Sequence, residues 1–194
     1  LWTVDLNGGP GFDFATIQEG VDAAADGDVI VVREGGYQQF AVSGKSLVLQ
    51  ASGPVTVNGL SFPFGSGPAI SVSGLAADQS VFMKGFTASR LILSDPFDAD
   101  AAVVSGNDGP VVFEDCSFFG SPGMWISGSS SVTLNRCTLD AGVTNWYSYG
   151  SFFVPRSGLF TRDSNTYLYQ TLAQGSVGPD AFTQPFSASP AGPG

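Results

Sequence analysis

Short apolar runs bounded by turn residues dominate the pattern along this chain. Residues 29–32 are four consecutive aliphatic positions, and alternating segments follow at 47–49, 55–57 and 70–72. Glycine, serine, proline or asparagine flanks each of these segments, as is typical of strands joined by tight turns. A continuous aliphatic run favours a strand that is buried on both sides or lies in a parallel sheet. The pattern therefore predicts an all-β protein.

One short helix is predicted near the start of the chain, over residues 16–25. Thr16 and Glu19 have the spacing of a capping box, in which each side chain accepts a hydrogen bond from a free backbone N–H group. Apolar residues at i, i+4 and i+7 from Ile17 form one narrow face. Such a helix is suited to cover the first coil of a solenoid, whose strand edges would otherwise be exposed.

An eight-residue motif recurs in the second half of the chain. Its pattern is apolar, any, apolar, two polar or small, apolar, any, apolar, and its copies start at residues 81, 111, 132 and, less regularly, 159. Repeats of this kind indicate stacked coils, and the intervals predict about five or six coils between residues 29 and 172. The inward positions are expected to form three columns: Val81, Val111, Val132 and Leu159; Met83, Phe113, Leu134 and Thr161; and Phe86, Cys116, Cys137 and Ser164.

The same periodicity sets the predicted domain boundary. Residues 1–175 are assigned to one β-helix domain, and the Pro/Gly-rich residues 176–194, which show no periodicity, to a tail or linker. Because the chain opens on Leu1 rather than methionine, we expect a processed product or a fragment of a longer protein.

The composition excludes some functions. Only 12% of the 194 residues are charged, the net charge is −10, and the seven basic residues are scattered, so nucleic acid is not an expected partner. Histidine is absent, which removes the commonest general base and transition-metal ligand. No apolar run is long enough for membrane insertion. An acidic, lysine-poor chain rich in glycine and serine suggests an extracellular or cell-surface location.

Two features of the repeat leave alternatives open. Cys116 and Cys137 fall in one inward column on neighbouring coils, and are either two buried thiols or a disulfide. The polar positions of the motif form two charged columns, which are either an acid–base cluster on a sugar-binding face or ladders of opposite charge. These columns are Gly85, Asp115, Arg136 and Asp163, and Lys84, Glu114, Asn135 and Arg162.

Three further clusters are candidate ligand sites. Asp95, Asp98 and Asp100 are predicted either to bind calcium or to be solvated loop acids. The same alternatives apply to Asp5, Asn7 and Asp13. The aromatic segment 145–153 contains Trp146, Tyr147 and Tyr149, which would either stack on sugar rings or a partner, or fold back as a local cap.

Residues 12–37 carry the pattern F-x-T-I-Q-x-x-V-D-A-A-x-x-G-D-x-I-x-V-x-x-G-x-Y. It resembles the N-terminal coil of pectin methylesterases and of uncharacterised surface β-helix proteins. The resemblance implies a right-handed parallel β-helix of the pectin-lyase-like superfamily. The catalytic motifs of pectin methylesterases, pectate lyases and polygalacturonases are all absent, so no catalytic residue is predicted and the resemblance carries over the fold without the activity.

The function that we expect from the sequence is a non-catalytic extracellular module with a structural, adhesive or self-assembly role. Its partners would be copies of itself or neighbouring domains of a larger surface protein. The alternative is a carbohydrate-active or carbohydrate-binding β-helix, with polysaccharide as the partner. No cofactor is expected, unless calcium binds at the acidic loops.

Overall fold

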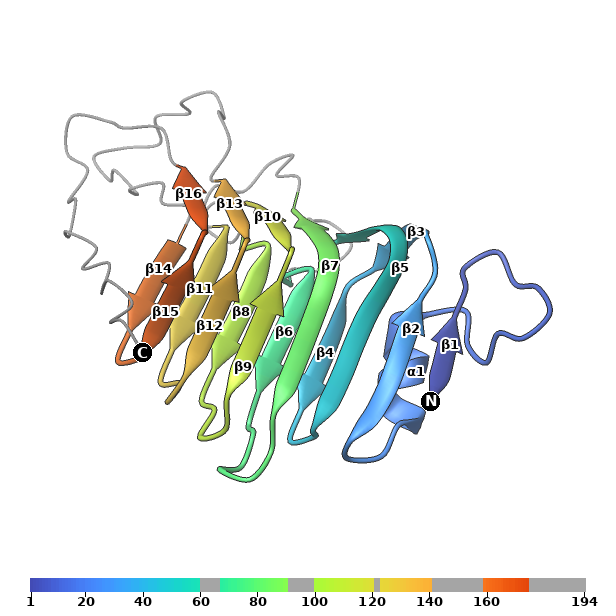
Figure 1. Cartoon of the computed structure of the whole chain (residues 1–194), viewed down its shortest axis with the longest axis horizontal. Coiled ribbons are helices and arrows are strands. Elements are labelled where there is room, and N and C mark those ends of the chain that lie inside the picture. The colour runs from blue at the N-terminus through green and yellow to red at the C-terminus, as the bar shows by residue number, and fades with distance from the viewer. Residues whose placement is uncertain (60–66, 91–99, 121–122, 141–158, 175–194) are drawn as a thin grey trace, which may run out of the picture.

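The structure, a computed structural model, describes residues 1–59, 67–90, 100–120, 123–140 and 159–174. Its strands stack side by side as the rungs of a parallel β-helix, with β1 (Trp2–Val4) near one end and β14 (Leu159–Arg162) near the other (Figure 1). Every strand pair among these residues is parallel. The predicted all-β solenoid is therefore confirmed.

The rungs form three faces. Face one consists of β1, β2 (Asp28–Val32), the first halves of β5 (Leu47–Asn58) and β7 (Val81–Ser89), β9 (Val111–Glu114), β12 (Val132–Asn135) and β15 (Thr166–Tyr169). Face two consists of β3 (Gly35–Gln38), the second halves of β5 and β7, β10 (Ser117–Phe119), β13 (Thr138–Asp140) and β16 (Leu172–Gln174). Face three consists of β4 (Phe40–Ser43), β6 (Ile70–Ser73), β8 (Ala102–Ser105), β11 (Met124–Ser127) and β14.

The predicted inward columns are confirmed for the first three copies of the repeat. Val81 is paired with Val111, and Val111 with Val132, so the three side chains are stacked and fully buried. Buried residues alternate with half-buried ones along β9 and β12, as expected when one side of a strand faces the core.

The prediction for the fourth copy is wrong. Leu159 is paired with Met124 on face three, and the residue that follows Val132 in its column is Thr166. The motif at 159–166 therefore begins on a different face from the other three copies. Consequently Thr161 and Arg162 do not continue the columns of Leu134 and Asn135, since Leu168 and Tyr169 pair with these residues.

From β7 onward, two bends in each coil use the left-handed backbone region. At the first bend, between faces one and two, the positive-φ residues are Gly85, Asp115, Arg136 and Gln170. At the second bend, after face three, they are Gly44, Gly74, Gly106, Gly128 and Asp163. Asp163 thus belongs to the second bend. The place after Arg136 at the first bend, which was predicted for Asp163, is occupied by Gln170. A left-handed residue turns the chain within a single position, which keeps successive coils in register.

The connection from face two to face three has a different length in each coil. It is residue 39 alone between β3 and β4, and it spans residues 59–69, 90–101, 120–123 and 141–158 in the coils that follow. The other two corners vary less, so differences between coils are concentrated along one edge of the molecule.

The predicted capping helix is present as α1 (Ile17–Ala23), and the Thr16–Glu19 capping box is confirmed. The helix is shorter than the predicted range 16–25 because Ala24 has extended backbone geometry. The Gln18 side chain binds the outer edge of face three: its Oε1 accepts from the Ala41 backbone N–H at 2.8 Å, and its Nε2 donates to the Ala41 carbonyl at 3.3 Å. One side chain thus makes the hydrogen bonds that a neighbouring strand would make.

Within the described residues, no helix has the length and apolar character needed to cross a membrane. The predicted tail over residues 176–194 lies outside the described residues, so the domain boundary at residue 175 stays a prediction.

Candidate functional site

The outward side chains of face one form two columns across β7, β9, β12 and β15. The register places Phe82, Val112, Thr133 and Tyr167 in one column, and Lys84, Glu114, Asn135 and Tyr169 in the other. Tyr167 and Tyr169 are 48% and 56% exposed, which makes them the most exposed aromatic side chains of the described residues. The last rungs of face one therefore present two tyrosine rings beside hydroxyl and amide groups.

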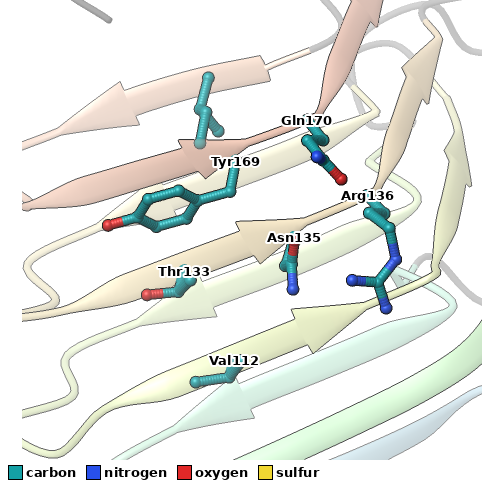
Figure 2. A pocket seen from close by; sticks show the side chains of 7 residues that line it. Val112, Thr133, Asn135, Arg136, Tyr169 and Gln170 are labelled. Atoms are coloured by element: carbon teal, nitrogen blue, oxygen red, sulfur yellow. The ribbon is translucent and has the colours of Figure 1, made fainter. Parts of the chain in front are cut away.

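A shallow depression of about 630 Å³ lies over these rungs. Figure 2 shows Tyr169, Asn135 and Thr133 on neighbouring strands, with Gln170 and Arg136 at the bend where these strands end. The residues that line the depression are Val112, Thr133, Asn135, Arg136, Leu168, Tyr169 and Gln170.

Backbone hydrogen bonds fix the positions of the bend residues beside the depression. The Asp115 N–H donates to the Asn135 carbonyl at 3.0 Å, and the Arg136 N–H donates to the Tyr169 carbonyl at 2.8 Å. Each left-handed residue is thereby bonded to the last strand residue of the next coil. The side chains of Arg136 and Tyr169 consequently start from backbone positions that are bonded to each other on adjacent coils.

Four charged side chains form a compact network at this bend. Arg136 binds Asp115 in a bidentate manner, with Nε–Oδ1 at 2.7 Å and Nη2–Oδ2 at 2.9 Å. The same Nη2 lies 2.9 Å from Glu114 Oε1, and Lys84 Nζ lies 2.6 Å from that oxygen. Lys84 also lies 3.6 Å from Asp115. Two cations therefore neutralise two carboxylates.

These pairings set the protonation of both carboxylates. The hydrogen bond from Lys84 lowers the pKa of Glu114, and the hydrogen bond from Arg136 lowers the pKa of Asp115. A general acid for glycoside chemistry needs the opposite shift, because it must hold its proton near neutral pH. The arrangement matches ladders of opposite charge, the second alternative of the sequence analysis, and not an acid–base cluster.

The two cysteines lie next to each other in the core, where the register of β10 with β13 places Cys116 beside Cys137. Both are free thiols in the structure. Their S–H groups donate to backbone carbonyls, that of Cys116 to Glu114 at 3.2 Å and that of Cys137 to Asn135 at 3.4 Å. The hydrogen bond with Cys137 and burial together raise the pKa of Cys116. The disulfide, one of the two alternatives that the sequence left open for this pair, stays a prediction.

The structure describes only some of the residues of the two candidate calcium sites. Asp95 and Asp98 lie outside the described residues, and Asp100 has interactions of its own. In the N-terminal loop, Asp5 pairs with Arg33 at 3.0 Å, and Asp13 accepts from the Thr3 N–H at 2.8 Å. Ordinary contacts with protein groups thus engage both of these carboxylates.

Asn7, the third member of the N-terminal cluster, donates its backbone N–H to Asp5 Oδ1 at 3.0 Å. Across the described ranges, no group of three or more acidic, cysteine or histidine residues is placed to hold a metal ion. Calcium binding stays a prediction.

The predicted aromatic platform of Trp146, Tyr147 and Tyr149 lies outside the described residues. The aromatic surface that the structure does describe, Tyr167 and Tyr169, was missed because the fourth repeat was placed on the wrong strand. The signal was the strict alternation over residues 166–169, which puts both tyrosines on the same side of one strand.

Comparison with known proteins gives one likeness. No protein-family model matches the chain, and no curated protein matches it. Among solved structures, the chain is similar to a pectin methylesterase, an aspartate-to-alanine mutant in complex with a hexasaccharide, with a TM-score of 0.51 and 18% sequence identity. The match covers 72% of this chain and 55% of the other, so the chain matches about half the length of that enzyme. The likeness confirms the expected parallel β-helix, and it concerns the fold alone.

Proposed function

We propose that this chain is a carbohydrate-binding β-helix that holds a glycan over the depression on face one. The observation that carries the proposal is the pair of exposed rings, Tyr167 and Tyr169, beside the hydroxyl and amide groups of Thr133 and Asn135. Aromatic rings offer flat apolar surfaces with a polar edge, which suits the C–H faces of a sugar ring. A few polar groups placed around such a surface give orientation and specificity.

Two further points support this proposal. A solved structure with the same fold is a pectin methylesterase in complex with a hexasaccharide. Moreover, the binding groups project from regular strands, which hold side chains more rigidly than loops do. Rigid positions lower the entropy lost when a ligand binds.

The proposal is for binding without catalysis. Glu114 and Asp115, the carboxylates bound to Arg136 of the depression, are ion-paired and have lowered pKa values. The structural, adhesive or self-assembly role expected from the sequence remains a separate prediction, as does the extracellular location.

Substitution of Tyr169 by alanine tests the proposal. Loss of a stacked ring is expected to cost about 1–1.5 kcal/mol of binding free energy, which is roughly a tenfold rise in Kd. Binding would be measured by affinity electrophoresis and calorimetry against a panel of polysaccharides. Phe119→Ala is the matched control, because Phe119 is an exposed aromatic residue (39%) on face two.

The outcomes separate two locations for the site. Equal binding by the wild type, Tyr169→Ala and Phe119→Ala would place any glycan site away from face one. If Trp146→Ala alone then removed binding, the platform predicted from the sequence would be the site. Failure of the wild type to bind any polysaccharide in the panel would refute the proposed function.

A further inference from the structure

Building on the proposed function, we infer that the glycan recognised on face one is uncharged and lacks free carboxylate or sulfate groups. The inference concerns the ligand class, and it follows from how the charges around the depression are already used. It separates this site from one built for an acidic polysaccharide.

The first step is that both cations near the depression, Lys84 and Arg136, are already paired with carboxylates of the protein. Arg136, which lines the depression, directs Nε and Nη2 to Asp115 and also contacts Glu114 through Nη2. Lys84 is bound to Glu114 at 2.6 Å. Bidentate guanidinium–carboxylate pairing is the geometry by which arginine would recognise a uronate, and here the protein's own Asp115 occupies that geometry.

The second step is the cost of displacing these partners. A glycan carboxylate that bound Arg136 would have to separate it from Asp115 or approach both carboxylates at close range. Either route places three carboxylates around two cations, so one negative charge is left without a partner. The chain as a whole carries a net charge of −10, which adds a repulsive long-range field for a polyanion.

The third step is the chemistry of the remaining groups. Besides Arg136, the polar side chains that line the depression are Thr133, Asn135, Tyr169 and Gln170, all of which are neutral. Hydroxyls and carboxamides both donate and accept hydrogen bonds, as sugar hydroxyls do. With an aromatic ring beside them, these groups match an uncharged pyranose chain.

The experiment compares neutral and acidic polysaccharides at two ionic strengths, with a chelator present so that calcium cannot bridge carboxylates. We would use a neutral galactan, a neutral xyloglucan and a polyuronate, with ionic strengths of about 0.01 M and 0.15 M. Across this range the Debye length falls from roughly 30 to 8 Å, so recognition through unpaired charges would weaken strongly. We expect a neutral polysaccharide to bind with a Kd that changes less than about twofold, and no binding of the polyuronate.

A double variant, Glu114→Gln with Asp115→Asn, tests whether the ion pairs of Lys84 and Arg136 are what excludes an acidic glycan. It removes both carboxylates and releases Lys84 and Arg136 while retaining the side-chain shapes. Asparagine also suits the left-handed backbone of Asp115 (φ 53°). We expect this variant to gain salt-sensitive binding of the polyuronate, by at least about tenfold, with a melting curve that shows it is folded.

The results distinguish this inference from the proposed function. Binding of the polyuronate alone by the wild type would overturn the inference and leave carbohydrate binding intact. Binding of none of the three polysaccharides would overturn the inference, and the wider panel described above would then decide whether carbohydrate binding fails with it. A folded double variant that gained no affinity for the polyuronate would also count against the inference, because ion pairing would not be what excludes the acid. Should that variant not fold, the wild-type comparison still tests the ligand class, and the single variant Asp115→Asn, which removes the bidentate partner of Arg136, tests the cause.

Discussion

Thr166 provides a quantitative test of the inward columns. It follows Val132 in the column that begins with Val81 and Val111, and its hydroxyl is buried without a hydrogen-bond partner. Burying a hydroxyl without a partner costs about 1–3 kcal/mol in proteins. Valine has nearly the same shape and no polar atom, so Thr166→Val should raise the free energy of unfolding by about 1–3 kcal/mol.

The assay is thermal unfolding followed by circular dichroism. For a chain of this length each kcal/mol shifts Tm by about 2–4 °C, so Thr166→Val is expected to raise Tm by roughly 2–12 °C. Thr138→Val is the control, since Thr138 is a half-buried outward residue of β13, and its effect should stay within about 0.5 kcal/mol. An unchanged or lower Tm for Thr166→Val, with Thr138→Val behaving as stated, would show that the Thr166 hydroxyl is satisfied and that the reasoning fails.

Three more predictions concern the rest of the solenoid. Because the hydrogen bond from its lysine partner lowers the pKa of Glu114 below the ordinary value of 4.5, this carboxylate stabilises the fold above that pH. The contribution should disappear as the pH falls through the folded pKa, and Glu114→Gln should show a weaker acid dependence of Tm; an identical acid profile would contradict the pairing. Cys116 and Cys137 should react with a thiol reagent only after unfolding, as counted by mass spectrometry, whereas a disulfide would leave no reactive thiol without a reductant. Gln18→Ala should lower stability by about 1 kcal/mol in urea titrations. Gln18→Glu should lower it at least as much, because the second carboxylate oxygen would face the Asp22 carboxylate and the Ala41 carbonyl. No loss in either variant would mean that the edge contact is dispensable.

Much of the fold could be predicted from the sequence because the information is local and periodic. The capping box at Thr16 and Glu19 requires only a three-residue spacing, and the structure contains both of its hydrogen bonds. The column of Val81, Val111 and Val132 follows from alternation within each strand together with the repeat itself.

The prediction for the fourth copy failed because a short strand motif does not determine on which face of the solenoid the strand lies. Residues 159–166 match the repeat in polarity, but the same apolar–any–apolar pattern serves all three faces of the solenoid. A second repeat, an aliphatic residue followed by Ser-Gly at 42–44, 72–74, 104–106 and 126–128, marks face three and its bend. The segment after Leu159 reads Thr161-Arg162-Asp163 and lacks this signature, so the second repeat does not identify the last strand of face three.

The candidate site was only partly accessible from the sequence for the same reason. The pairing of Lys84 with Glu114 followed from the aligned columns, whereas the contact of Arg136 with both carboxylates depends on side-chain geometry. The depression joins β9, β12 and β15, and no short segment of the chain contains its residues.

The edge where face two passes into face three has a consequence for how such a molecule can diversify. Each coil there has its own connection, from residues 120–123 to residues 141–158, while the rungs on either side keep their register. Insertion or exchange of sequence at that edge would change the surface without altering the stacking of the interior. The stacked rungs of the β-helix can therefore stay unchanged while different peptide segments are inserted at one edge, independently of the tyrosines on face one.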